Sequence, residues 1–115
     1  MTLSSWVNPT GTIQDGIIVN RFGANGSRGW ALRLNAADYG VNKPFECAIS
    51  SDGTDGGVVK RLSVINPASG TFYHAACVYN ASAQTFDIYV NGILDNGTLT
   101  GTVPASQFNP AVSVK

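Results

Sequence analysis

Apolar and polar residues alternate with a period of two along most of this chain, and no segment keeps the roughly 3.6-residue period of an amphipathic helix. The alternation is clearest over 30–35 (WALRLN) and 45–50 (FECAIS). It predicts half-buried β-strands, each with one wet face. The predicted strands cover 3–7, 16–22, 30–35, 45–50, 58–65, 71–80 and 86–93, with weaker patterns at 99–103 and 112–114.

Two of these runs form the strongest local pattern in the chain. Residues 71–80 (TFYHAACVYN) and 86–93 (FDIYVNGI) flank a short polar loop, and the second run ends in Asn91-Gly92. Asn-Gly is a strong hairpin signal, so an antiparallel sheet is expected. Strands at this spacing without helices favour an all-β antiparallel sandwich or jelly roll, built as a single domain over 1–115.

Composition narrows the classes of partner. The formal net charge is zero and charged residues make up 12% of the 115 residues, with no basic tract. Binding to nucleic acid or to an anionic membrane surface is therefore not expected. No apolar run approaches the ~20 residues that span a bilayer. The first residues also lack the charged and apolar regions of a signal peptide.

Two cysteines, Cys47 and Cys77, fall in two predicted strands. A bridge between these strands is compatible with the pattern. Two buried free thiols are equally compatible, because free cysteine behaves as a small core residue. The sequence leaves both interpretations open, and it disfavours zinc, which wants four ligands.

Several segments together resemble one family. Residues 72–80 resemble the W-x-H-V-A-x-x-Y-D strand of laminin-G-like modules in the concanavalin A-like lectin and glucanase superfamily, and 86–95 resemble the partner strand L-x-I-Y-V-N/D-G. Residues 4–9, 17–21 and 29–34 resemble the strands S-x-W-V-x-P, x-I-V-S-K and G-Y-x-L-x-L. Five motifs in family order imply a concanavalin A-like jelly-roll sandwich.

The chain departs from the family pattern in two ways. Phe72 stands where tryptophan is usual. Family modules also have strands before the first motif and a closing strand after the last, so the chain resembles a module that is incomplete at both ends. Open sheet edges would follow, and these favour a homo-oligomer, either a dimer or a strand exchange.

The resemblance implies a lectin, a glycanase or an adhesion module, and the residues disfavour the glycanase. Glycoside hydrolysis needs two carboxylates facing each other. The only glutamate is Glu46, and its strand holds no second carboxylate. His74 has no nucleophile in a catalytic motif and is interpreted as a structural strand residue. We therefore expect no enzyme and no catalytic residue.

Glycan binding needs an exposed aromatic ring with polar groups beside it. The predicted ligand-binding residues are Asp38, Tyr39, Asn42, Asp52 and Asp55. Plain turn packing explains Tyr39 equally well. Asp52 and Asp55 are also candidate ligands for Ca²⁺, although an Asp-Gly turn accounts for both, and no cofactor is required.

The remaining aromatic residues are assigned to the fold. Trp6, Trp30, Phe45 and Phe72 are predicted to lie in the core. Tyr73, Tyr79 and Tyr89 are predicted to stack across the hairpin. The sequence thus predicts a non-catalytic recognition or adhesion module of a larger extracellular or surface protein, binding carbohydrate. The alternative is a structural or assembly sandwich that self-associates without a small ligand.

Overall fold

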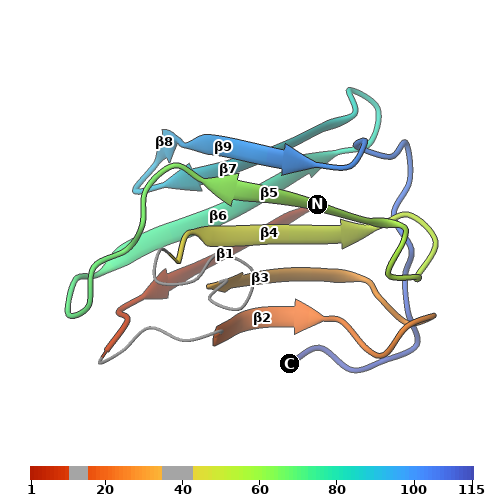
Figure 1. Cartoon of the computed structure of the whole chain (residues 1–115), viewed down its shortest axis with the longest axis horizontal. Helices are drawn as coiled ribbons and strands as arrows, with labels where there is room; N and C mark the ends of the chain where they lie inside the picture. The colour runs from red at the N-terminus through yellow and green to blue at the C-terminus, as the bar shows by residue number, and fades with distance from the viewer. Residues whose placement is uncertain (11–15, 35–42) are drawn as a thin grey trace.

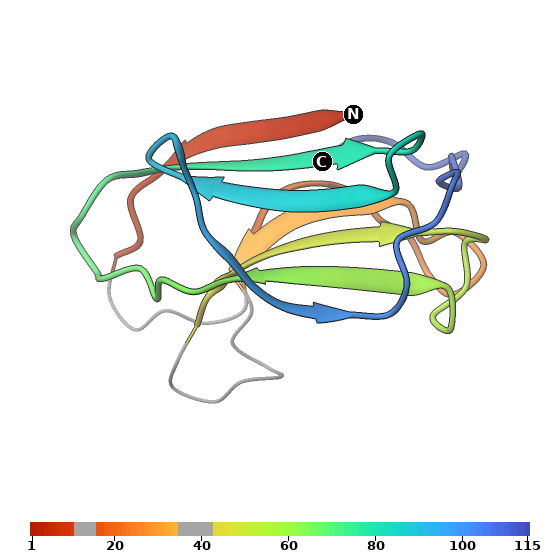
Figure 2. The same ribbon diagram turned by 90° about the horizontal axis from the view of Figure 1, so that it is seen from above.

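The computed structural model describes residues 1–10, 16–34 and 43–115, and these residues form two antiparallel β-sheets packed face to face (Figures 1 and 2). The strands are β1 (Thr2–Val7), β2 (Gly16–Arg21), β3 (Trp30–Leu34), β4 (Phe45–Ser50), β5 (Val58–Ser63), β6 (Tyr73–Asn80), β7 (Thr85–Val90), β8 (Ile93–Leu94) and β9 (Asn96–Thr100). One sheet has the order β1-β6-β7-β8 and the other the order β2-β3-β4-β5-β9. The predicted all-β sandwich is confirmed. None of the described residues forms a helix long and apolar enough to cross a membrane.

The predicted strands and the observed ones differ mainly toward the carboxyl end. The strand predicted over 58–65 ends at Ser63, and the weak pattern at 99–103 corresponds to β9, which starts earlier at Asn96. Residues 112–114 form no strand. Instead Lys115 and Asn20 exchange two backbone hydrogen bonds of 2.8 Å at the edge of β2.

The core lies between the sheets, where alternate residues of each strand face inward. Fully or almost fully buried members include Leu32, Phe45, Cys47, Ile49, Cys77, Phe86 and Ile88. Figure 2 shows the two layers edge-on, with the chain crossing from one sheet to the other between β8 and β9. Burial of these side chains is the main favourable term in folding.

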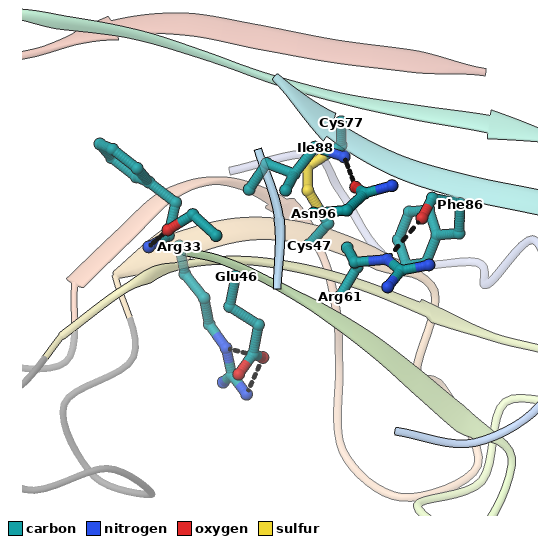
Figure 3. The surroundings of a disulfide bond; sticks show 10 residues. Arg33, Glu46, Cys47, Arg61, Cys77, Phe86, Ile88 and Asn96 are labelled. Carbon is teal, nitrogen blue, oxygen red and sulfur yellow. Dashed lines mark hydrogen bonds and ion pairs between the residues drawn. A yellow bond between two sulfur atoms is a disulfide. The ribbon is translucent and has the colours of Figure 1, made fainter. Parts of the chain in front are cut away.

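A disulfide joins the two sheets through the middle of the core. Cys47 of β4 and Cys77 of β6 are bonded, and both are fully buried (Figure 3). Of the two interpretations left open by the sequence, the bridge is therefore confirmed and the free thiols are wrong. The bonded strands belong to different sheets, so the bond clamps the layers together.

The aromatic predictions are partly wrong. Phe45 is fully buried and Trp30 packs against the core, as predicted. Trp6 and Phe72 are instead 69% and 65% exposed. Trp6 occupies an outward position of β1, because the inward positions belong to Leu3 and Val7.

The predicted tyrosine stack does not form. Tyr73 and Tyr79 face the core, where their rings lie edge-on to Phe45 and Phe86 at centroid distances of 5.8 and 6.2 Å. Tyr89 alternates with buried Ile88 and Val90 and therefore faces outward. Residues on opposite faces of a sheet cannot stack.

Tyr79 also ties the carboxyl-terminal segment to the sandwich, because its hydroxyl donates a 2.6 Å hydrogen bond to the carbonyl of Pro104. Burial raises the pKa of the Tyr79 hydroxyl above its ordinary 10.0, since a buried phenolate is disfavoured. The folded chain thus holds this proton more tightly than the unfolded chain. Its contribution to stability is complete below about pH 10 and is lost as the pH rises through the raised value.

We expect Tyr79→Phe to lower the free energy of unfolding by about 1 kcal/mol near neutral pH, where one hydrogen bond is lost. We also expect the variant to lose less stability than the wild-type chain between about pH 9 and 11. Thermal unfolding followed by circular dichroism across this range measures both effects. Parallel pH dependence of the two proteins would contradict the assignment.

Candidate functional site

The predicted site residues Asp52 and Asp55 lie in the connection between β4 and β5, at one end of the sandwich. This connection docks on the segment between β2 and β3, where the amides of Gly26 and Arg28 both donate to the carbonyl of Gly53 at 2.9 and 2.8 Å. The other three predicted residues, Asp38, Tyr39 and Asn42, lie outside the described residues.

Both described carboxylates of this set already accept hydrogen bonds from the protein. Asp52 accepts the backbone amide and the hydroxyl of Thr54 at 2.8 Å each, and these bonds lower the pKa of the Asp52 carboxyl because they favour its charged form. Asp55 pairs with the guanidinium of Arg28 at 2.5 Å. The arrangement fits a braced polar turn.

Asp52 and Asp55 provide few free oxygen ligands for a calcium ion. Calcium takes six to eight oxygen ligands, whereas Asp55 faces a cationic guanidinium and Asp52 is engaged by Thr54. Over residues 1–10, 16–34 and 43–115, no three His, Cys, Asp or Glu side chains gather where they could hold a metal ion. A calcium site at Asp52 and Asp55 stays a prediction.

Glu46 is held in a buried ion pair on the outer face of the five-stranded sheet. Arg33 lies directly across from it on β3, and the Nε and Nη2 atoms of Arg33 lie 2.7 and 2.6 Å from Glu46 Oε1. Figure 3 shows Glu46 directed away from the disulfide, toward Arg33. Glu46 is fully buried, so its carboxylate is enclosed rather than presented to a substrate.

The outer face of the four-stranded sheet carries an aromatic strip, defined here as the exposed Trp6 and the half-buried His74 and Tyr89. Trp6 and His74 are directly opposite each other on β1 and β6, with ring centroids 5.3 Å apart and planes tilted by 58°. Tyr89 lies on the next strand, opposite Ala76. Cross-strand and diagonal neighbours on one face lie within reach of aromatic side chains, so the three rings form one surface.

The turn beside the strip fixes the backbone of His74. Its amide donates to Asn91 Oδ1 at 2.9 Å, and its carbonyl accepts the Asn91 amide at 2.8 Å. Asn91 and Gly92 have φ angles of 53° and 78°, the positive values that a tight Asn-Gly hairpin turn requires. The strip therefore stands on a regular sheet rather than on a loop.

The surroundings of the strip are almost uncharged. The outward residues of the four strands are Thr2, Ser4, Trp6, His74, Ala76, Val78, Asn80, Thr85, Asp87, Tyr89 and Leu94. Asp87 is the one carboxylate in this set, and it accepts a 2.7 Å hydrogen bond from Asn96 Nδ2. The face thus combines the exposed ring of Trp6 with hydroxyl groups and little charge.

Sequence reasoning missed this surface because it assigned Trp6 to the core. A usable signal was present: with a period of two, Trp6 falls in step with polar Thr2 and Ser4, and out of step with Leu3 and Val7. The same parity places His74 and Tyr89 outward.

The chain matches a known protein family in sequence and a solved structure in fold. The family model described as "Concanavalin A-like lectin/glucanases superfamily" (Laminin_G_3) matches residues 1–113. A solved structure described as "a putative carbohydrate binding protein from Bacteroides ovatus ATCC 8483" superposes with a TM-score of 0.64 at 20% identity. The match covers 95% of this chain and 27% of that one, and at this identity it shows the fold alone. No curated protein matches the chain.

Proposed function

Because the chain belongs to the concanavalin A-like lectin/glucanases superfamily, we propose that it is a non-catalytic recognition module that binds carbohydrate. The structural neighbour supports this proposal through its description as a "putative carbohydrate binding protein", although the chain spans about a quarter of that protein's length. The observation that carries the proposal is the exposed Trp6 of the aromatic strip.

The chemistry of the strip suits a neutral sugar. The C–H face of a pyranose packs on an aromatic ring, and its hydroxyls need donors and acceptors nearby. Trp6 is 69% exposed and offers such a ring, and the His74 ring lies beside it on the next strand. The hydroxyl of Ser4 lies on the same face, one outward position away. A nearly uncharged face favours neutral glycans over acidic ones.

The carboxylates support the non-catalytic part of the proposal. Each of the five described carboxylates accepts a hydrogen bond or ion pair from the protein: Glu46 from Arg33, Asp52 from Thr54, Asp55 from Arg28, Asp87 from Asn96 and Asp95 from the amide of Ile65. Glycoside hydrolysis needs two carboxyl groups that face the substrate from opposite sides. Of the five, Glu46 is fully buried, and Asp52 and Asp55 lie in one connection, bonded to Thr54 and Arg28.

The disulfide supports an extracellular or surface location. Structural disulfides form and persist in oxidising compartments and are rare in the cytosol, and the Cys47–Cys77 bond lies fully buried in the core. A homo-oligomer, the state predicted from the sequence, belongs to the same proposal. In this proposal, glycan binding at the aromatic strip needs no calcium, because the strip contains no carboxylate.

Trp6→Ala is expected to weaken binding of a neutral polysaccharide by about 10-fold or more, because one stacking surface is removed. A panel of neutral and acidic glycans, screened with and without Ca²⁺, identifies a ligand, and isothermal titration calorimetry then measures the loss. Ile17→Ala is the matched control, since Ile17 is 63% exposed but lies on β2 of the other sheet.

Two outcomes would overturn the assignment. No binding across the panel would remove the carbohydrate function and leave the structural alternative. Loss of binding in Asp52→Ala or Asp55→Ala, with Trp6→Ala unaffected, would move the site to the predicted loop residues.

A further inference from the structure

The aromatic strip extends from β1 across β6 to β7, so it is longer than its exposed ring. Trp6 lies opposite His74 on β6, and the next outward residue of β6, Ala76, lies opposite Tyr89 on β7. The Cα atoms of Trp6 and Tyr89 are therefore about 12 Å apart, two strand spacings across the sheet and two residues along it. Side chains stand roughly perpendicular to a sheet, so the two rings are separated by a similar distance. One pyranose ring is too small to cover both.

The surface between the two rings is low. A straight line from Trp6 to Tyr89 crosses β6 between His74 and Ala76. Ala76 carries only a methyl group, and the half-buried His74 ring lies against Trp6 at a centroid distance of 5.3 Å. A ligand that lies on Trp6 can therefore continue over Ala76 to Tyr89 without meeting a large side chain.

Asn91 adds a fixed hydrogen-bond donor beside Tyr89. Its Oδ1 atom accepts the His74 amide at 2.9 Å, and its own backbone amide donates to the His74 carbonyl at 2.8 Å. These two bonds hold the carboxamide in place. In the part of the chain that the structure describes, Nδ2 of Asn91 donates to no other group, and the residue is exposed. Its two N–H groups are therefore open to a ligand hydroxyl.

Each of the two rings has a polar neighbour on its own strand. The hydroxyl of Ser4 lies one outward position from Trp6 on β1, and Nδ2 of Asn91 lies just beyond Tyr89 at the end of β7. The carboxylate of Asp87, on the same face, is already engaged by a neighbouring carboxamide at 2.7 Å. An aromatic ring with a neutral polar group beside it is an arrangement that suits one sugar unit. The strip contains this arrangement twice.

We propose that the strip has two sugar subsites, one at Trp6 and one at Tyr89, and that its ligand is a linear, neutral, β-linked polysaccharide lying across the strands. This inference deepens the proposed function and rests on it. Both rings belong to the same face of one sheet. An extended β-linked chain lies flat along such a face and reaches both rings, whereas a helical α-linked chain curves away from the second.

Two subsites on one ligand make the affinity depend on chain length. Once one sugar unit is held at Trp6, a unit further along the same chain meets Tyr89 at a high effective concentration. A short oligosaccharide fills one subsite and gains nothing from the other. Chain length therefore separates the contribution of Tyr89 from that of Trp6.

Isothermal titration calorimetry with cello-, xylo- and manno-oligosaccharides is expected to show, for at least one series, an affinity that rises about 10-fold from disaccharide to hexasaccharide. Tyr89→Leu is expected to abolish this rise and to leave the disaccharide affinity within about 2-fold of wild type, because the Trp6 subsite is intact. Tyr89→Phe keeps the ring and is expected to keep the rise. Malto-oligosaccharides, the α-linked series, are expected to show no rise.

Thr85→Ala is the matched control. Thr85 is an exposed outward residue of β7, like Tyr89 on the same face, but it lies at the opposite end of the strand. The variant is expected to bind each oligosaccharide like the wild-type chain. A folding defect does not imitate the expected result, because a smaller active fraction changes the titration stoichiometry and not the ratio of long-chain to short-chain affinity.

The outcomes separate this proposal from the function on which it rests. No binding of any oligosaccharide or polysaccharide would remove both. Binding that weakens in Trp6→Ala but does not depend on chain length would overturn the two subsites and leave the carbohydrate function. The same holds if affinity rises with length equally in Tyr89→Leu. A rise for the α-linked series alone would overturn the extended β-linked ligand.

Discussion

Replacing Arg33 with methionine is expected to lower the free energy of unfolding by about 3–5 kcal/mol, because it removes the guanidinium that binds a fully buried carboxylate. Glu46 is fully buried, and Nε and Nη2 of Arg33 both lie within 2.7 Å of its Oε1 atom. Without the guanidinium, Glu46 must stay buried with less compensation or take up a proton. Chemical denaturation of the two proteins measures the difference.

The double variant Arg33→Met/Glu46→Leu is the informative comparison. Replacing a buried ion pair by apolar residues of similar volume is often neutral or stabilising, so the double variant is expected to recover most of the loss. A cost below about 1 kcal/mol for Arg33→Met alone would mean that the pair behaves like an exposed one. Fold stability is measured here without reference to any ligand.

The individual strands were predictable because apolar residues recur at every second position. The observed strands β3 and β4 begin at the predicted residues, Trp30 and Phe45. The wet face predicted for 45–50 is wrong, because every residue of β4 is buried. The order of the strands within the sheets was not predictable in the same way. A period of two tells which residues face inward, but it does not tell which strands become neighbours.

β9 shows why the tail was harder to predict. Asn96-Gly97 looks like a turn signal, but in the structure Asn96 Oδ1 accepts the Ile88 amide at 2.8 Å. A Cβ atom on Gly97 would lie 2.9 and 3.0 Å from the carbonyl oxygens of Ser63 and Leu62. Glycine is needed because β9 approaches β5 closely, which is a tertiary requirement that local sequence does not encode.

The candidate site was likewise only partly predictable from the sequence. The outward position of Trp6 follows from its parity with Thr2 and Ser4, so that part was present in the sequence. The partner of Asp55 was not, because Arg28 lies 27 residues away on another connection. Carboxylates in a glycine-rich loop are typical both of ligand sites and of braced turns, and only the tertiary contact distinguishes them.

Removing the disulfide by the double substitution Cys47→Ala/Cys77→Ala is expected to lower the free energy of unfolding by about 3.6 kcal/mol. The two cysteines are 30 residues apart in the sequence, and a cross-link that closes a loop of this length restricts the unfolded chain by about that amount. For a domain of this size the midpoint of thermal unfolding would fall by roughly 15 °C. Differential scanning calorimetry measures both quantities.

The position of the bond gives a second, kinetic expectation. Both sulfur atoms are enclosed between the sheets, since Cys47 and Cys77 are fully buried, and thiol exchange needs access to the sulfur that is attacked. A reductant should therefore leave the folded chain oxidised and act only once the chain unfolds. Rapid reduction at room temperature, or a double variant as stable as the wild-type chain, would contradict a bond that clamps the two layers. Slow reduction at the rate of global unfolding would place the bond in the most stable part of the sandwich, beneath the sheet that carries the aromatic strip.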